Sequence, residues 1–481
     1  MDGRSLPNLG TPVPGPASEA LVASLARTEC PAITARRGRR ANETQIAQDP
    51  IVWTQAVGAN VQDADGNVFV DLTAAFAVAG LGHRHPDVVA AAHAQVDRLI
   101  HGMGDVYPSD VKIRFCEALA AVAPGDLEQS ILGLSGASAI EAALKTAAVH
   151  TGKPGAIAFF GGYHGLSIGA LSVTGYRDSF RRPFLGQLNP WVRHVPYPDP
   201  YRPPLGLGFD ASPEDVRDRC LAHVRELLHN PASGSEAVGA IVVEPIQGRG
   251  GEVVPPAGFL GGIREICDEL GLVMILDEIY TGFGRTGDMF ACEREGVVPD
   301  VLCVGKAMGG GFPLSAAIGR PAVMQSWGAS SGEAIHTSTF LGNPLGCAMG
   351  IAALEVLQRD DWPAVVRTRG DALRTDLDAL AGRHEGVGCV RGRGFMLGLE
   401  LVRDTSTREP DPTRALAVTD ACRRAGYLVL PSGIWGNVVA VTPPFPITDD
   451  QLDGFLAALD AALAHCGVTA ERRLSKPGDS R

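Results

Sequence analysis

The sequence predicts an α/β fold whose strands run parallel, and two stretches carry this prediction. Residues 272–276 and 300–305 are short apolar runs bounded by turn residues, as is typical of strands buried on both faces of a parallel sheet. Asp277 ends the first run, and Lys306 follows the second, just before three consecutive glycines. Open α/β sheets place their sites at the carboxyl ends of the strands. We therefore expect Asp277 and Lys306 to meet in one pocket.

Length and composition limit the classes of protein that need to be considered. A chain of 481 residues predicts two or more domains, and 45% apolar with 20% charged residues is typical of a soluble globular protein. The net charge of −12 argues against general nucleic-acid binding. No apolar run reaches a membrane-spanning length, and residues 1–16 lack the apolar core of a signal peptide. The ten cysteines include no CxxC and no zinc-type spacing, so we expect no metal site and a cytoplasmic location.

The first half of the chain predicts helices and strands in alternation, after a Pro- and Gly-rich tail at residues 1–16 that we expect to be disordered. A hairpin spanning 58–72 turns at Asp65-Gly66. The predicted helices are 17–27, 86–100, 110–122, 138–150, 213–229 and 258–270. The predicted strands are 130–134, 156–160 and 238–243. The stretch 176–204, rich in Arg, Pro and Tyr, is expected to be an ordered loop or an excursion towards a partner subunit.

The second half continues with a strand at 313–320 and then a mainly helical segment. Helices are predicted at 346–357, 367–380 and from Thr448 to near His465, and strands at 389–401, 427–430 and 438–441. Residues 467–481 are expected to form a solvated, disordered tail.

A turn at Ser135-Gly136-Ala137 links the strand 130–134 to the next helix. Ser138 and Glu141 have the spacing of a capping box. A glycine turn at a helix N-terminus offers free N–H groups and the positive end of the helix dipole to a phosphate. Without a ligand, the same residues form an ordinary capped helix.

The pair Asp277 and Lys306 suits one kind of organic chemistry. Burial favours the neutral, nucleophilic amine of a lysine, which forms Schiff bases with aldehydes such as pyridoxal phosphate. A carboxylate facing the pyridine nitrogen keeps that nitrogen protonated, which makes the ring an electron sink. On these two residues alone, an ordinary ion pair at the strand ends is the favoured interpretation, because structural pairs of this kind are common.

Several ordered motifs resemble one family. DEIYTGFGRTG from Asp277, the lysine at its distance and EPIQG from Glu244 are similar to the class III (fold type I) pyridoxal-phosphate aminotransferases, from about Gly15 to about Cys466. The resemblance implies a large domain, 86–345, with a mostly parallel seven-stranded sheet. It also implies a smaller α+β domain built from both chain ends, 17–85 and 346–466.

The resemblance implies a role for each matching residue. Lys306 binds pyridoxal phosphate as a Schiff base and then moves the substrate proton, while Asp277 pairs with the pyridine nitrogen. Tyr163 and Ile279 pack on the two faces of the ring. Thr339 reaches the phosphate bound in a neighbouring subunit, which implies a homodimer with shared active sites. The other implied cofactor-binding positions are Ser135, Gly136, Ala137, His164, Tyr280 and Ser338.

Four positions depart from the family pattern at the cofactor: Leu134, Ala137, Ser138 and Tyr280. LSGASA replaces the usual NSGTEA or NSGSEA, so Ala137 lacks a hydroxyl and Ser138 stands for Glu, although the backbone N–H groups remain. Tyr280 stands where many relatives have glutamine. Its hydroxyl could bond the phenolic oxygen of the cofactor in the same way, or its bulk could reshape the pocket.

The substrate positions depart further. Relatives that use glutamate or 4-aminobutyrate carry two arginines for carboxylates, and here these positions are Leu166 and Ala440. Phe76 stands where ornithine-using relatives have a hydroxylated aromatic. Without an arginine partner, Glu244 could face the substrate and favour a cationic or polyhydroxylated amine, or it could be a structural acid. Alternatively, Arg249 supplies a relocated carboxylate contact.

The leading interpretation is an aminotransferase that acts on an amine or amino acid other than a typical glutamate/4-aminobutyrate pair, with a keto acid or aldehyde as the second substrate. Racemases, epimerases and aminomutases share this fold, so they form the alternative, because fold does not fix the reaction. The glycines of SGAS and MGGG do not form GxGxxG, which disfavours a dinucleotide-binding protein. A scaffold that binds the cofactor without turnover is disfavoured by the joint presence of Asp277, Lys306 and Thr339.

Overall fold

A seven-stranded sheet forms the centre of the large domain in the computed structural model, which describes residues 1–34, 50–329 and 332–474. The strands are β4 (Gln129–Gly133), β5 (Gly155–Phe159), β6 (Val192–Val195), β7 (Val238–Val243), β8 (Val273–Asp277), β9 (Val301–Val304) and β10 (Ser315–Gly319). They are ordered β4-β10-β9-β8-β7-β5-β6. Only β10 is antiparallel to its neighbours, so the predicted mostly parallel α/β sheet is confirmed.

Helices cover both faces of this sheet. The helices of the large domain are α5 (Pro86–Val96), α6 (Asp110–Val122), α7 (Gly136–Thr151), α8 (Ile168–Val173), α9 (Asp178–Arg181), α10 (Pro213–His229), α11 (Phe259–Leu270) and α12 (Pro321–Met324). Side chains alternate along each strand. In β8, Met274 and Leu276 pack in the cluster that contains α6, α10 and α11, whereas Val273 and Ile275 pack with α7 and α8. Every residue of β7, β8 and β9 is buried, which explains their continuous apolar sequences.

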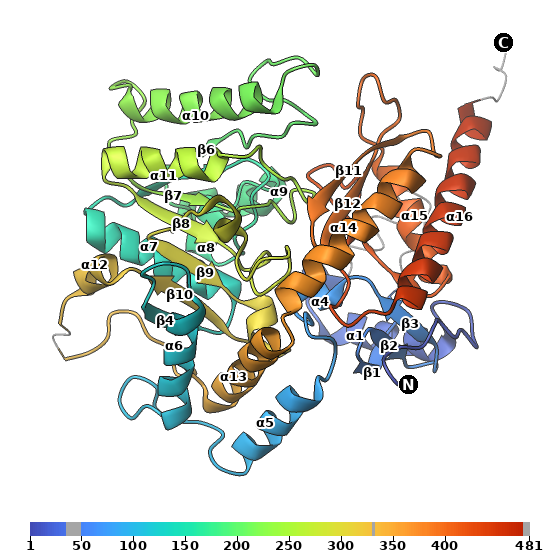
Figure 1. Cartoon of the computed structure of the whole chain (residues 1–481), viewed down its shortest axis with the longest axis horizontal. Helices are drawn as coiled ribbons and strands as arrows, with labels where there is room; N and C mark the ends of the chain where they lie inside the picture. The colour runs from blue at the N-terminus through green and yellow to red at the C-terminus, as the bar shows by residue number, and fades with distance from the viewer. Residues whose placement is uncertain (35–49, 330–331, 475–481) are drawn as a thin grey trace.

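Both ends of the chain build the small domain (Figure 1). One sheet has the order β1-β2-β3-β13 and the other β11-β12-β15-β14. The strands are β1 (Trp53–Val57), β2 (Asn60–Asp63), β3 (Val68–Asp71), β11 (Val387–Arg393), β12 (Met396–Leu401), β13 (Tyr427–Leu428), β14 (Leu430–Ser432) and β15 (Val438–Val441). The helices are α1 (Pro16–Thr28), α2 (Pro31–Thr34), α4 (Ala74–Ala77), α14 (Trp362–Ala381), α15 (Pro412–Arg424) and α16 (Asp449–Leu474). Helix α13 (Pro344–Arg359) packs against α5 and α6 of the large domain (Figure 1). The two chain ends meet directly where β13 pairs with β3 in parallel.

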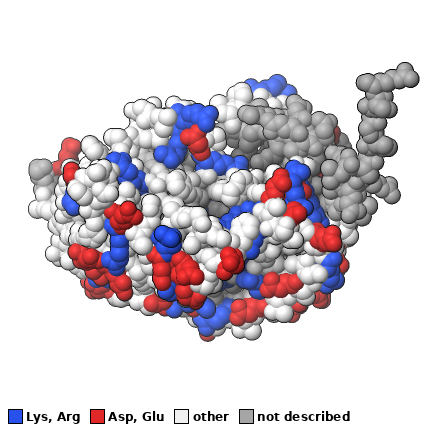
Figure 2. Space-filling model, turned by 90° about the horizontal axis from the view of Figure 1, so that it is seen from above, with Lys and Arg blue, Asp and Glu red and all other residues white. Residues whose placement is uncertain are grey.

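Four short 3₁₀ helices complete the described elements: η1 (Arg182–Gln187), η2 (Ala291–Glu295), η3 (Lys306–Gly309) and η4 (Gln325–Trp327). No helix in the described part of the chain has both the length and the apolarity to cross a lipid bilayer. Acidic and basic side chains are interspersed over the face shown in Figure 2.

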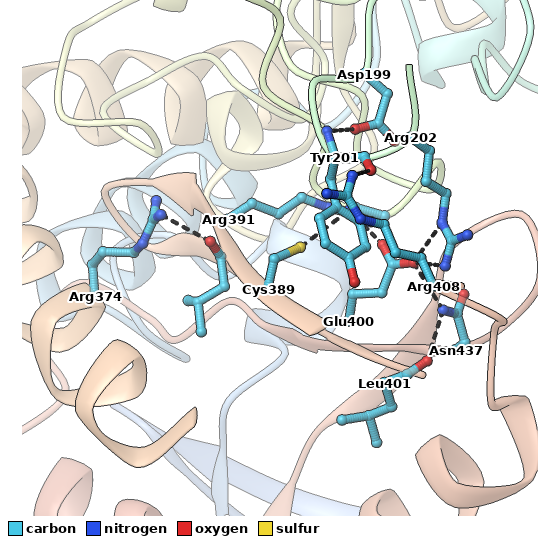
Figure 3. Close-up of polar contacts among 12 residues, drawn as sticks. Asp199, Tyr201, Arg202, Arg374, Cys389, Arg391, Glu400, Leu401, Arg408 and Asn437 are labelled. Carbon is cyan, nitrogen blue, oxygen red and sulfur yellow. Dashed lines mark hydrogen bonds and ion pairs between the residues drawn. The ribbon is translucent and has the colours of Figure 1, made fainter. Parts of the chain in front are cut away.

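A buried ion cluster joins the two domains (Figure 3). Glu400 of β12 accepts hydrogen bonds from Arg202 Nε at 2.7 Å, Arg391 Nη1 at 2.5 Å and Asn437 Nδ2 at 3.1 Å. Arg202 belongs to the segment that follows β6 in the large domain, whereas the other three residues belong to the small domain. The exposed fraction of the Glu400 side chain is 1%. The cluster therefore fixes this segment of the large domain against the second sheet of the small domain.

The N-terminal segment differs from the disordered tail expected for residues 1–16. Asn8 forms an antiparallel bridge with Val68, with Asn8 N donating to Val68 O at 2.9 Å. Gly10 N donates to the Asn67 side chain at 2.9 Å. The Pro- and Gly-rich composition predicted disorder, but an extended segment can still pair with a hairpin. Residues 35–49 of the N-terminal segment lie outside the described residues.

The predicted capping box at Ser138 and Glu141 is wrong. Helix α7 begins at Gly136, and Ser135 is its N-cap, with Ser135 Oγ accepting from Ser138 N at 3.2 Å. Ser135 takes this position because it follows β4 with extended dihedral angles, φ −147° and ψ 156°. Glu141 instead accepts from Gly169 N at 2.8 Å and so ties α7 to α8.

Other boundaries also differ from the sequence-based predictions. The stretch 176–204 contains strand β6, and the predicted strand 389–401 is a hairpin of β11 and β12 that turns at Gly394, where φ is +55°. Helix α15 was missed, although Asp411 caps it and Pro412 starts it. Helix α16 runs to Leu474, past the predicted end near His465, and residues 475–481 lie outside the described part of the chain.

Candidate active site

Three ionisable side chains gather at the carboxyl edge of the central sheet. Glu244 follows β7 directly, Asp277 is the last residue of β8, and Lys306 lies two residues beyond the end of β9. Since β7, β8 and β9 are adjacent and parallel, these residues end up at one edge. The edge is the place at which the sequence predicted a pocket.

Asp277 is held by the loop that follows β5. Its exposed fraction is 4%, and its Oδ2 lies 2.7 Å from His164 Nδ1. Oδ1 accepts from Ile279 N at 3.1 Å. Burial alone would lower the pKa of His164, but the hydrogen bond and charge of Asp277 raise it above its ordinary value. The imidazole therefore fixes the orientation of the carboxylate and stabilises its negative charge.

Lys306 opens η3 with a left-handed backbone, φ +44°, which is strained for a residue with a Cβ. Its Nζ lies 4.5 Å from the centroid of the Tyr280 ring. Burial lowers the pKa of Lys306 to about 8, against the opposing charges of Asp277 and Glu244. The neutral amine is thus available at a pH where an ordinary lysine is almost fully protonated.

This shift gives a testable titration. In protein freed of cofactor, acylation of Lys306 by acetic anhydride should rise through a pH of about 8, because only the neutral amine reacts. The exposed Lys153, measured in the same sample by peptide mass spectrometry, is the reference lysine. If the two lysines followed the same curve, the Lys306 amine would not be desolvated.

Glu244 is occupied by backbone groups. Its Oε1 accepts from Tyr163 N at 2.9 Å and its Oε2 from Gly248 N at 3.0 Å, and 5% of the residue is exposed. Burial raises the pKa of this carboxyl above its ordinary value, although the nearby His164 lowers it. The geometry differs from the expected carboxylate that faces the substrate and favours the structural alternative. Glu244 orients the backbone that carries the Tyr163 ring.

The N-terminus of α7 forms a cradle beside these groups. In the described part of the chain, the N–H groups of Gly136 and Ala137 have no acceptor, as expected for a first helical turn. A Cβ added to Gly136 would lie 2.8 Å from Ile279 Cδ1, and one added to Gly165 would lie 2.6 Å from Ala137 Cβ. Glycine at both positions therefore lets the helix end, the loop after β5 and Ile279 converge. The Ser135 and Ser138 hydroxyl groups lie 2.8 Å apart at the same end.

Tyr280 has a hydrogen-bond partner that the sequence did not indicate. Its hydroxyl lies 2.9 Å from Thr442 Oγ1, at the end of β15. Burial raises the pKa of Tyr280 to about 12, so the hydroxyl stays protonated. Of the two alternatives for this position, the contact favours a residue that shapes the pocket.

Five of the predicted site residues are exposed: Phe76, Ser135, Arg249, Ser338 and Thr339. Phe76, with 58% of its surface accessible, lies on α4, where all four residues have φ between +44° and +65°. Ser338 and Thr339 lie on the surface of the chain, in a segment where Thr337 Oγ1 donates to Asp105 Oδ2 at 2.8 Å. In a single chain, neither of these two residues joins the buried groups around Lys306.

Sequence reasoning singled out Arg249 but missed its neighbours. The Arg249 guanidinium carbon lies 5.7 Å from the Tyr163 ring centroid and 5.3 Å from that of Tyr176. Tyr176 and Arg177 follow α8, at the start of the stretch 176–204, and belong to no motif. No motif or spacing in the sequence indicated that these two residues would lie beside Arg249.

Fold and site together define an enzyme that uses pyridoxal phosphate. A buried lysine amine, a carboxylate fixed by histidine and free N–H groups at a helix N-terminus fit the aldehyde, the pyridine nitrogen and the phosphate of this cofactor. The chain belongs to the family of class-III aminotransferases, whose family model matches residues 42–463.

Known proteins that are similar to this chain differ in the reactions for which they are named. An alanine/serine racemase from Pyrococcus horikoshii is 34% identical over 417 residues, covering 86% of each chain. An acetylornithine aminotransferase from Methanopyrus kandleri is 37% identical over 418 residues, 87% of this chain and 95% of the relative. The structure of an amine transaminase from an uncultivated Pseudomonas species, with pyridoxal phosphate bound, has a TM-score of 0.80 and 31% identity over 87% of this chain and 95% of its own.

Proposed function

We propose that the enzyme transfers the amino group of an amine or amino acid other than a typical glutamate/4-aminobutyrate pair to a keto acid or aldehyde. The observation that carries this proposal is the apolar character of Leu166 and Ala440, where a carboxylate clamp would stand. Leu166 is exposed in the loop after β5, and Ala440 lies on β15 opposite Gly398. Each missing arginine removes a charge-assisted contact of about 1.5–3 kcal/mol from a dicarboxylate substrate.

Pyridoxal phosphate, when bound, supplies an aldehyde and a protonated ring that stabilises negative charge on the substrate carbon. We infer that Lys306 would bind its aldehyde and that Asp277 would pair with its pyridine nitrogen. Tyr163 and Ile279 would enclose the ring, and the N–H groups of the α7 N-terminus would bind the phosphate. His164 holds the Asp277 carboxylate in place, where it would face the pyridine nitrogen.

Lys306 has the properties of the base that moves the substrate proton. With a pKa of about 8, its amine can accept a proton and return it near neutral pH. Tyr280, fixed by Thr442, bounds the space beside the amine and keeps it aimed into the pocket. A single base placed at one side of the substrate suits transfer between two carbons on that side.

We also propose a cytoplasmic homodimer in which Ser338 and Thr339 serve the partner's phosphate site. Their exposure in the single chain supports this proposal, as does the apolar surface next to them, where His101 packs on Phe340 with ring centroids 5.2 Å apart. The scattered cysteines support the location.

Replacing Thr339 with alanine should weaken pyridoxal-phosphate binding about tenfold or more, because one charge-assisted hydrogen bond is lost. Equilibrium dialysis measures this, with Thr337→Ala as the matched surface control. Mixing Thr339→Ala with Lys306→Ala subunits should restore one intact site per dimer. No recovery of tight binding in mixed dimers would contradict a shared site.

The proposed function is tested by the absorbance of the loaded enzyme mixed with single enantiomers of amines, without keto acid. Conversion of the cofactor to its pyridoxamine form by one amine would establish the first half of aminotransfer and identify the donor class. A persistent band, together with appearance of the opposite enantiomer, would establish a racemase, which is the second candidate because of the racemase relative. A protein that changes neither amine nor cofactor would contradict both.

A further inference from the structure

Two arginines share one tyrosine ring beside the candidate site. The Arg177 guanidinium carbon lies 4.9 Å from the Tyr176 centroid, and that of Arg249 lies 5.3 Å from it. The Tyr176 ring meets the Tyr163 ring edge-on, with centroids 6.1 Å apart. Both guanidinium groups therefore contact Tyr176, and Tyr176 in turn contacts Tyr163, the residue predicted to pack on the cofactor ring.

A loop of the small domain fixes this arrangement. Tyr176 Oη and Arg177 Nη2 both donate to Gly433 O, at 3.2 Å and 3.0 Å, and Gly433 N donates to Arg249 O at 3.2 Å. Gly433 has a φ of +86°, which favours glycine, and a Cβ at Gly251 would lie 3.1 Å from Gly433 Cα. The arginines are thus pre-positioned, which lowers the entropy lost when they bind a ligand.

The positive charge of this pair is not neutralised within the described residues. Neither Arg177 nor Arg249 forms an ion pair there, and Arg177 Nε is buried without a hydrogen-bond partner. Glu244 is already bound by two backbone N–H groups. Burial raises the pKa of Glu252 to about 8, although the nearby charges of Arg391 and Arg249 lower it, so this carboxyl is mainly uncharged at neutral pH. The pair needs an anion from outside the chain.

Arg249 lies near the reacting lysine, and its charge helps to lower the pKa of Lys306. A Cβ on Gly248, the residue before Arg249, would lie 2.9 Å from the Tyr280 ring, and the Lys306 amine lies 4.5 Å from the centroid of the same ring. The Arg249 side chain is exposed, so a ligand can reach it. An anion bound here would belong to a molecule that also reaches Lys306.

We propose that Arg249, with Arg177 beside it, binds the carboxylate of a 2-oxo acid that accepts the amino group. This inference rests on the proposed function and names the class of its second substrate. The planar, permanently charged guanidinium suits a carboxylate. The two arginines bind the substrate carboxylate, which the apolar Leu166 and Ala440 cannot do. They bind one carboxylate, whereas the two arginines of glutamate-using relatives bind two.

The test compares pyruvate with methyl pyruvate, which has the same reacting carbonyl but no charge. Enzyme in its pyridoxamine form is mixed with each compound, and the return of the pyridoxal absorbance is followed against concentration to separate affinity from rate. Arg249→Met should lower kcat/KM for pyruvate about 10–100-fold, through KM, and leave methyl pyruvate nearly unchanged. Arg249→Lys should recover part of the loss.

The matched control is Arg182→Met, because Arg182 is exposed and already paired with Asp178 on the same stretch of chain. It should keep the pyruvate preference of the wild type. Equal losses for both compounds in Arg249→Met would make Arg249 a structural residue and overturn the inference. A wild-type protein that forms no pyridoxamine with any amine would instead overturn the proposed function.

Discussion

Replacing Lys306 with alanine is expected to lower kcat by at least about 10³-fold, because the variant lacks both the amine that holds the cofactor and the base that moves the proton. Cofactor binding should persist at reduced affinity, since the α7 N-terminus and Asp277 remain. The visible spectrum of the loaded variant should be that of free pyridoxal phosphate. Steady-state turnover with the donor found by absorbance, together with this spectrum, checks the prediction.

The matched control is Lys153→Ala, because Lys153 is exposed in the turn between α7 and β5. It should leave both kcat and the spectrum unchanged. An added primary amine such as methylamine should restore part of the activity of Lys306→Ala, because a small base can enter the space that the side chain has left. Normal turnover by Lys306→Ala would contradict the proposed mechanism.

The pair at the centre of the site could be predicted because each residue follows an uninterrupted apolar strand. β8 and β9 are buried along their whole length, so their ends are visible in the sequence as a change from Val, Ile and Leu to a charged residue. The parallel arrangement then brings Asp277 and Lys306 to one edge. The meeting of these two residues can therefore be predicted without knowledge of long-range contacts.

Other parts of the site depend on contacts that no local pattern contains. His164 meets Asp277 across 113 positions of sequence, and Tyr176 meets Gly433 across 257. The occupation of both Glu244 oxygens by backbone N–H groups also leaves no trace in residue types. For this reason, sequence alone left Glu244 and Arg249 as competing substrate contacts, whereas in the fold both Glu244 oxygens accept backbone N–H groups and the Arg249 side chain is exposed.

In the fold, too, the elements with a clear local sequence pattern could be predicted and those without one could not. Strand β6 was missed because only Val195 of its four residues is buried, as expected at a sheet edge, so the apolar pattern that marks β7 and β8 is absent. Residues 1–16 were wrongly predicted to be disordered, because amino-acid composition does not indicate whether a segment pairs with a distant hairpin. Helix α15, by contrast, had readable cap residues at Asp411 and Pro412.

Replacing Glu400 with alanine is expected to lower the free energy of unfolding by about 3–5 kcal/mol, which is the cost of leaving buried charges without their partner. Arg202 and Arg391 would then face each other across the domain boundary, with only 16% and 12% of their side chains exposed. Urea unfolding of the cofactor-free protein measures the change. Glu409→Ala is the control, since Glu409 pairs with Arg403 at the surface and should contribute at most about 1 kcal/mol.

The pH dependence separates lost charge from lost packing. Burial would raise the pKa of Glu400, but the charges of Arg391 and Arg202 lower it below its ordinary value. A carboxyl with a lowered pKa in the folded state stabilises the protein above its unfolded pKa of about 4.3, and this contribution is lost as the pH falls through the folded value. The difference between wild type and Glu400→Ala should therefore be full at neutral pH and shrink in acid. A difference that stayed constant down to acid pH would mean that the side chain stabilises the domain boundary by packing alone.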